Sequence, residues 1–175
     1  AVQALVAALK ADENGSVRVA AANALGQLGG AAAARPRARG SEARAALREA
    51  LQDKERRVLM TAWGTLAKIE PETGPEAVQA LVAALTADKE LDVRQIAAMA
   101  LGELGELGEL AGPEAVQALL AALKDDIWYK VRSAAAKSLG QLGGVGAKEA
   151  LATAAIEDGF SLVHEAVLEA LAKLS

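Results

Sequence analysis

The stretch DVRQIAAMALGELG, from Asp92 to Gly105, decides the fold because the chain repeats it with variations. Related stretches occupy residues 16–29, 57–70, 130–143 and 162–175. Within the stretch, Val93, Ala97 and Leu101 recur at helical spacing, which places them on one side of an α-helix. A helical segment that returns at intervals along a chain is typical of stacked helical repeats, in which each unit buries its apolar side on its neighbours.

A second helical segment precedes each copy of the first. The string AVQALVAAL occupies residues 1–9, returns unchanged at 77–85 and, with one leucine for valine, at 115–123. Gly-Pro-Glu introduces two of these segments, and proline followed by glutamate suits the first turn of a helix. The sequence therefore predicts an all-α chain of five helix pairs.

The boundaries of the units follow from this pattern. We expect a single domain over residues 1–175, with a longer link at residues 30–41 that fits a loop or an extra helical turn. Gly-Glu-Leu repeats near residues 102–110 predict a longer second helix in the third unit. The predicted units are residues 1–30, 42–71, 76–111, 114–144 and 147–175.

Polar residues and glycines mark the ends of the second helices. Asp92 and Ser16 are placed to act as N-caps. A glycine that can stop the helix in a left-handed conformation occurs at Gly29, Gly105 and Gly143. A second glycine lies inside the helix, where it costs about 1 kcal/mol relative to alanine, so it predicts a close contact or a bend. These internal glycines are Gly26, Gly102 and Gly140.

Composition narrows the location and the class of partner. The chain has no cysteine, no uninterrupted apolar run of about 18 residues and no signal-like basic head, so we expect a cytoplasmic protein without a membrane role. The formal net charge is −4, with a net +4 over residues 31–57 and −9 over residues 70–126. The arginines near residues 35–48 are a candidate phosphate-binding cluster, but no aromatic residues interleave them, so nucleic acid is disfavoured.

The sequence lacks the motifs of catalysis. There is one histidine, His164, and a metal site needs several ligands in fixed geometry. The glycines of LGELGELG lie in a helical pattern, without the strand that a phosphate-binding fingerprint requires. We therefore expect no enzyme activity, no metal and no cofactor.

The strings DVRQIAAMALGELG, SVRVAAANALGQLG and KVRSAAAKSLGQLG resemble the HEAT-like repeats first named from phycobilin lyases, and artificial proteins built from a consensus of them. The resemblance is weaker in the second unit, where Leu59 replaces the arginine, and in the fifth, where His164 does. It implies a right-handed α-solenoid of five two-helix HEAT-like repeats, with the second helices lining the concave side. It also implies that the arginine of each Val-Arg pair bonds to a neighbouring repeat, which assigns structural inter-repeat roles to Arg18, Arg94 and Arg132.

Aromatic residues give the best candidates for a contact surface. Trp128 and Tyr129 precede the second helix of the fourth unit and cannot both face the same way, so we expect one of them to be exposed. Phe160 lies at the corresponding turn of the fifth unit. The alternative is that Trp128 and Phe160 fill the groove between units, the role that we expect for Trp63. The variable positions of the second helices add further candidates: Gln95, Met99, Ser133 and Lys137.

The hypothesis that follows is a non-catalytic protein-binding scaffold whose partner is another protein or another copy of itself. Two alternatives stay open. One is a self-assembling subunit that uses its uncapped first helix and its charge asymmetry. The other is an accessory domain of a larger signalling or lyase-type enzyme.

Overall fold

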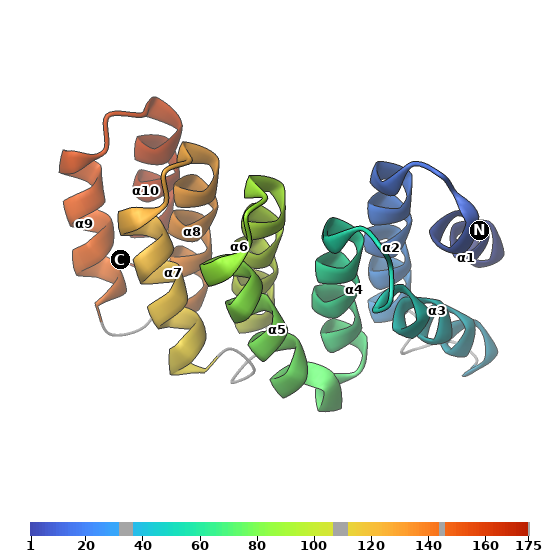
Figure 1. Cartoon of the computed structure of the whole chain (residues 1–175). Helices are drawn as coiled ribbons and strands as arrows, with labels where there is room; N and C mark the ends of the chain where they lie inside the picture. Colours follow the sequence, from blue (N-terminus) through green and yellow to red (C-terminus); the bar gives the residue numbers. More distant parts are fainter. Residues whose placement is uncertain (32–36, 107–111, 144–145, 175) are drawn as a thin grey trace. The chain divides into compact units, whose positions relative to one another are not determined.

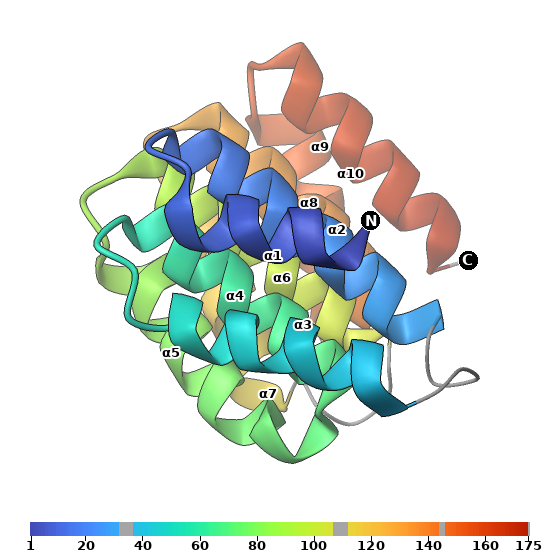
Figure 2. The ribbon, with the colours of Figure 1, turned by 90° about the vertical axis from the view of Figure 1, so that its right-hand side faces the viewer.

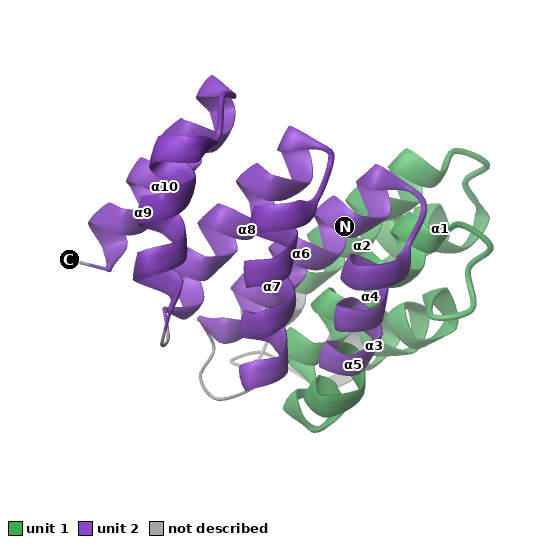
Figure 3. Ribbon diagram, turned by 60° about the vertical axis from the view of Figure 1, so that its left-hand side comes forward, with its two compact units in different colours: residues 1–77 green, residues 78–175 purple. Residues whose placement is uncertain are grey.

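The computed structural model describes residues 1–31, 37–106, 112–143 and 146–174, and these residues form ten α-helices, one short 3-10 helix and no strand (Figure 1). The predicted all-α fold is confirmed. The chain divides into two compact units, residues 1–77 and residues 78–175, which are shown in different colours in Figure 3. Helix α5 (Gly74–Ala87) runs across this division.

The first unit holds two helix pairs. The first pair is α1 (Val2–Ala11) with α2 (Gly15–Ala31), and the second is α3 (Arg37–Ala50) with α4 (Arg56–Ile69). A 3-10 helix, Pro71–Thr73, follows them. Helix α1 lies beside α3, and α2 lies beside α4, so the pairs stack in two layers (Figure 2). The core between them is aliphatic and contains Leu9, Leu25, Leu47, Val58 and Leu66.

The second unit stacks its helices in the same way. Helix α6 (Leu91–Gly105) packs on α8 (Tyr129–Leu142), and α8 packs on α10 (Ser161–Lys173). Helices α7 (Pro113–Asp125) and α9 (Ala147–Glu157) form the other layer (Figure 1). Fully buried leucines hold the layers together, each contributing roughly 1.5–3 kcal/mol by its burial. They include Leu101, Leu119, Leu139 and Leu151.

The ten helices of the described residues agree in number with five predicted helix pairs, but several predicted ends are wrong. Asp92 lies inside the first turn of α6, whose N-cap is Glu90 without a side-chain hydrogen bond. Gly105 ends α6 without a positive φ, and the expected extension of this helix falls mainly on residues 107–111, outside the described part. Gly143 does end α8 with a φ of 66°. Five of the twelve residues of the predicted link, residues 32–36, also lie outside the described part.

Asn14, rather than Ser16, supplies the polar group at the start of α2. Its Oδ1 accepts a hydrogen bond from the Ser16 N–H at 2.9 Å. Gly29 does not stop this helix, because α2 continues to Ala31. In both cases the helix begins or ends within two residues of the prediction, which is the usual uncertainty of a helix boundary.

The internal glycines mark close contacts between neighbouring helices. A Cβ on Gly140 would lie 2.6 Å from the Cα of Ala170, so the backbones of α8 and α10 approach at this point. A Cβ on Gly102 would lie 2.5 Å from Oγ of Ser138, on the next helix of the same layer. The cost of glycine in a helix is therefore offset by closer packing of one repeat on the next.

We expect Gly140→Ala to destabilise the second unit by about 1–3 kcal/mol, because the added methyl meets backbone that cannot move aside. Alanine is the better helix former by about 1 kcal/mol, so propensity alone predicts the opposite sign. The matched control is Gly105→Ala, whose Cβ would meet Cδ2 and Cγ of Leu142, atoms of a side chain rather than of the backbone. Urea unfolding monitored by circular dichroism would measure the stability of Gly140→Ala and of Gly105→Ala. Equal urea midpoints for the two variants would contradict the packing argument.

Candidate protein-binding surface

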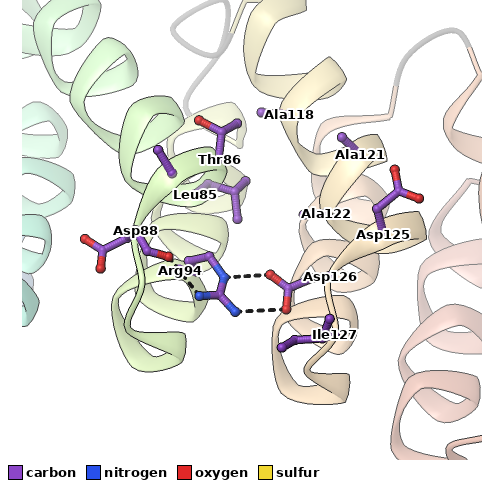
Figure 4. Close-up of a pocket in the computed structure, with 11 residues that line it drawn as sticks. Leu85, Thr86, Asp88, Arg94, Ala118, Ala121, Ala122, Asp125, Asp126 and Ile127 are labelled. Atoms are coloured by element: carbon purple, nitrogen blue, oxygen red, sulfur yellow. Dashed lines mark hydrogen bonds and ion pairs between the residues drawn. The ribbon is translucent and has the colours of Figure 1, made fainter.

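A buried arginine links the third repeat to the fourth. Arg94, near the start of α6, donates from Nε to Asp126 Oδ2 at 2.7 Å and from Nη2 to Asp126 Oδ1 at 3.1 Å. Its Nη1 donates to the main-chain oxygen of Asp88 at 2.8 Å, in the turn that precedes its own helix. Figure 4 shows the guanidinium facing the carboxylate across the two repeats. This two-bond pairing fixes orientation as well as distance.

The same pairing recurs at two other steps. Arg18 donates to Asp53 at 2.8 and 3.0 Å within the first unit. Arg132 donates to both carboxylate oxygens of Asp158 within the second unit. The second repeat carries Leu59 at the position that these arginines occupy.

The pairings shift the pKa values of Arg94, Asp158 and Asp53. The Asp126 hydrogen bond raises the pKa of Arg94 above its ordinary value. The Arg132 hydrogen bond holds the pKa of Asp158 below its usual range, against the opposing effect of burial. Burial would raise the pKa of Asp53, but hydrogen bonds from Arg18 and from the Glu55 N–H lower it. These groups are therefore charged and structural at neutral pH.

Each paired aspartate also fixes the turn that carries an aromatic residue. Asp126 Oδ1 accepts a hydrogen bond from the Trp128 N–H at 2.9 Å, and Asp158 Oδ1 accepts one from the Phe160 N–H at 3.0 Å. Trp128 and Phe160 thereby become the N-cap residues of α8 and α10, with exposed fractions of 45% and 52%. About half of each side chain faces solvent, so neither Trp128 nor Phe160 is fully buried between the repeats.

Tyr129 joins the two turns. Its ring stacks on Phe160 with a centroid distance of 5.2 Å and an interplanar angle of 10°. The guanidinium of Arg132 lies 5.3 Å from the centroid of the Phe160 ring, within the range of a cation–π contact. The arginine that pairs the repeats thus also supports the exposed ring.

Two aliphatic residues that the sequence analysis missed extend this surface. Ile127 is 80% exposed and Leu162 is 52% exposed. The other repeats have Glu13, Lys54, Lys89 and Gly159 at the position of Ile127. A comparison of the five repeats at this position identifies Ile127 as unusual, whereas a search for aromatic residues does not find it. We call the set of Ile127, Trp128, Tyr129, Phe160 and Leu162 the aromatic edge.

The other candidates lie on the second helices. Ser133 Oγ donates to the main-chain oxygen of Leu162 at 3.3 Å, so Ser133 touches the aromatic edge from α8. Lys137 is exposed on the same helix, 3.9 Å from a carboxylate oxygen of Glu169. Gln95 is half-buried and Met99 is 47% exposed, both on α6, and no described hydrogen bond or ring contact links either of them to the aromatic edge. Trp63 is half-buried on α4, in the first unit.

A pocket of about 400 Å³ opens beside Ile127 (Figure 4). Its apolar wall comes from α5 and α7, where Leu85, Ala118 and Ala122 line it, and the Arg94–Asp126 pair closes one side. The described residues contain no cluster of histidine, cysteine and carboxylate side chains that could hold a metal ion. They also contain no helix that is long and apolar enough to cross a membrane.

Stacked helix pairs joined by arginine–aspartate contacts define a helical-repeat protein. The family model for HEAT repeats matches residues 2–102 and 104–172, so the chain belongs to the HEAT repeat family. The resemblance inferred from the repeated strings is therefore confirmed. A comparison with curated proteins found no significant match.

Solved structures share the fold over nearly the whole chain. One is from the complex of CpcE and CpcF of phycocyanin lyase from Nostoc sp. PCC7120, with a TM-score of 0.67, 24% identity, and coverage of 97% of this chain and 96% of that one. Another is a designed armadillo repeat protein, with a TM-score of 0.60, 20% identity, and coverage of 99% and 82%. At these identities the likeness establishes the fold alone.

We expect Arg94→Ala to destabilise the second unit by about 3–5 kcal/mol, because it leaves the Asp126 carboxylate buried without its cation. Arg94→Lys keeps the charge but loses the two-bond geometry, so its stability should lie between those of Arg94→Ala and the parent chain. The control is Lys173→Ala, which removes an exposed ion pair with Glu169 worth at most about 1 kcal/mol. A chemical unfolding series would measure all three, and equal losses for Arg94→Ala and Lys173→Ala would contradict a structural role.

Acid should weaken the same contacts. The pKa of Asp158 is lower in the folded chain than its unfolded value near 3.9. Its contribution is therefore complete above that value and is lost as the pH falls through the folded-state pKa. We expect the stability of the parent chain to fall more steeply below about pH 4 than that of Asp158→Asn, which has no proton to bind there. If the free energies of unfolding of the parent chain and of Asp158→Asn fall equally with decreasing pH, the Arg132–Asp158 pair does not govern acid unfolding.

Proposed function

We propose that the chain is a non-catalytic protein-binding module that uses the aromatic edge of its second unit. The observation that supports this most directly is the exposure of Ile127, Trp128, Phe160 and Leu162 in adjoining turns. Single exposed apolar residues are ordinary, but a group of them that includes aromatic rings is typical of an interaction site.

The aromatic edge is preorganised. Hydrogen bonds to Asp126 and Asp158 fix the main chain at Trp128 and Phe160. The rings of Tyr129 and Phe160 are held by their mutual stack. A side chain that is already ordered loses less conformational entropy on binding, so more of its contact energy appears as affinity. Tryptophan and tyrosine supply the largest energies at protein interfaces.

Polar residues beside the aromatic edge suit the rim of such an interface. Ser133 adjoins Leu162, and Lys137 lies exposed further along α8. We assign Gln95 and Met99 to an outer part of the same surface, because they occupy on α6 the positions that Ser133 and Lys137 occupy on α8. The partner that fits this arrangement is a protein segment with apolar side chains for the aromatic edge.

Two carboxylates of the second unit, those of Asp126 and Asp158, have structural partners, which argues against a catalytic role for them. Asp126 and Asp158 are engaged by arginines and by turn N–H groups, so they are structural anions. The histidine that could act as a base, His164, has its Nδ1 3.0 Å from the main-chain oxygen of Ala155. The fold is shared with a chain of phycocyanin lyase, and an accessory role beside an enzyme of that class would be served by the same binding surface.

The exposure of Trp128 can be measured by fluorescence quenching. In a Trp63→Phe background, which removes the second indole, we expect iodide to quench the remaining emission readily, because 45% of Trp128 is exposed. Unfolded chain in urea would provide the upper limit of quenching. Protection comparable to that of a buried indole would reject Trp128 as an exposed anchor.

Binding by the aromatic edge can be tested with a displayed random peptide library. We expect peptides selected on the intact chain to bind Trp128→Ala/Phe160→Ala at least about tenfold more weakly, the loss typical of interface anchors. The control is Leu28→Ser in the first unit, an equally simple loss of an exposed apolar side chain (40% exposed) that should leave binding unchanged. Peptides that bind both variants as well as the parent would place the binding site elsewhere.

A further inference from the structure

A small pocket recurs between the first helices of neighbouring repeats. The α1–α3 pocket, in the first unit, has a volume of about 250 Å³, and the α5–α7 pocket, in the second unit, has a volume of about 400 Å³. Equivalent apolar residues line both, because α1 and α5 share the string AVQALVAAL and because α3 and α7 bury residues at the same spacing. These residues are Leu9, Ala46 and Ala50 in the first pocket and Leu85, Ala118 and Ala122 in the second.

In the α1–α3 pocket the chain supplies a basic side chain of its own. Lys10, in the last turn of α1, forms an ion pair with Glu49 of α3, and both residues line the pocket. A lysine can lay its methylene groups on an apolar wall while its ammonium group stays in water beside a carboxylate. The first unit therefore shows what this kind of pocket accepts: a long basic side chain paired with an acid.

The α5–α7 pocket has the same apolar wall without that ion pair. Thr86 stands at the position of Lys10, and its hydroxyl group donates to a main-chain oxygen of its own helix at 2.9 Å. Ala121 stands at the position of Glu49. Two short side chains thus replace two long ones, and the pocket is the larger of the two (Figure 4).

The α5–α7 pocket also keeps an excess of negative charge. Three carboxylates, those of Asp88, Asp125 and Asp126, line it together with one cation, Arg94. Arg94 is engaged by Asp126 through two hydrogen bonds. Asp125 is exposed, and its carboxylate forms no hydrogen bond or ion pair with the described part of the chain. The pocket therefore offers a carboxylate to a cation from outside.

The mouth of the α5–α7 pocket adjoins the aromatic edge. Ile127 lines the pocket, belongs to the aromatic edge and is 80% exposed. A segment that lies on the aromatic edge therefore passes the pocket. Residues 78–175 contain 14 acidic and 8 basic residues, a net charge of −6, which attracts a basic partner and repels an acidic one.

We propose that the α5–α7 pocket binds a lysine or arginine side chain of the partner protein whose apolar residues contact the aromatic edge. The stem of this side chain lies on Leu85, Ala118 and Ala122, and its charged group pairs with Asp125. The pocket thereby adds a requirement for a basic residue to the apolar contacts of the edge, and it sets the register of the partner segment. This inference rests on the proposed function, because it places the basic residue in a segment that the aromatic edge binds.

The peptides selected on the intact chain provide the probe. Among those that Trp128→Ala/Phe160→Ala weakens, we expect a lysine or arginine at a fixed distance from the apolar residues. Replacing this residue of the peptide with methionine, which is similar in length but uncharged, should weaken binding about tenfold. Asp125→Asn should weaken the original peptide by a similar factor and leave the methionine peptide unchanged, because the two substitutions remove the same ion pair.

A second variant tests whether the pocket itself is occupied. Thr86→Lys/Ala121→Glu transfers the ion pair of the first unit into the α5–α7 pocket without changing the net charge, so it should weaken peptide binding about tenfold. Both positions are exposed on helices. The matched control is Lys10→Thr/Glu49→Ala, which removes the same pair from the first unit and should bind the peptides as the parent does. Circular dichroism would establish that each variant is folded.

Three results would overturn the inference while the proposed function stands. One is a set of peptides that depend on Trp128 and Phe160 but share no basic residue. Another is equal binding of these peptides to Asp125→Asn and to the parent. The third is undiminished binding to the folded Thr86→Lys/Ala121→Glu variant. If Trp128→Ala/Phe160→Ala itself leaves peptide binding unchanged, the proposed function fails, and this inference fails with it.

Discussion

The pairing of a buried arginine with an aspartate of the next repeat is the contact on which the stack depends. Alanine-rich helices bury little apolar area per residue, so the leucines alone leave the angle between neighbouring repeats weakly defined. The guanidinium of Arg94 fixes this angle, because its two parallel hydrogen bonds to Asp126 set both the distance and the orientation of the third repeat relative to the fourth. An equivalent pair, Arg132 with Asp158, joins the two repeats whose backbones approach each other at Gly140.

The proposed binding surface is built on the same contact. Asp158 takes the hydrogen bonds of Arg132 and of the Phe160 N–H at once, and Arg132 in turn lies against the Phe160 ring. The packing of one repeat on the next is therefore coupled to the placement of the aromatic edge, since the same residues join the repeats and position the exposed rings. Binding there would favour the stacked form, because a ligand stabilises the state that it binds.

Periodicity was sufficient to predict the helix pairs and their number, and the family resemblance implied that the arginine of each Val-Arg pair bonds to a neighbouring repeat. It could not predict the stack of Tyr129 on Phe160, because that contact depends on the distance between two turns and each residue occurs once in the chain. It also failed at Asp92, where the turn geometry set by Asp88 starts the helix earlier than the capping preference suggested. Ile127 was missed because it is unusual only beside the other repeats.

The aspartate turns have a consequence for the variation of this family. In every repeat the aspartate side chain accepts the N–H of the residue two positions later, and that residue is Asn14, Glu55, Glu90, Trp128 or Phe160. The hydrogen bond uses only main-chain atoms of the second residue, so it places no demand on its side chain. Each repeat can therefore present a different side chain from the same backbone position, and new recognition properties can evolve there without disturbing the stack.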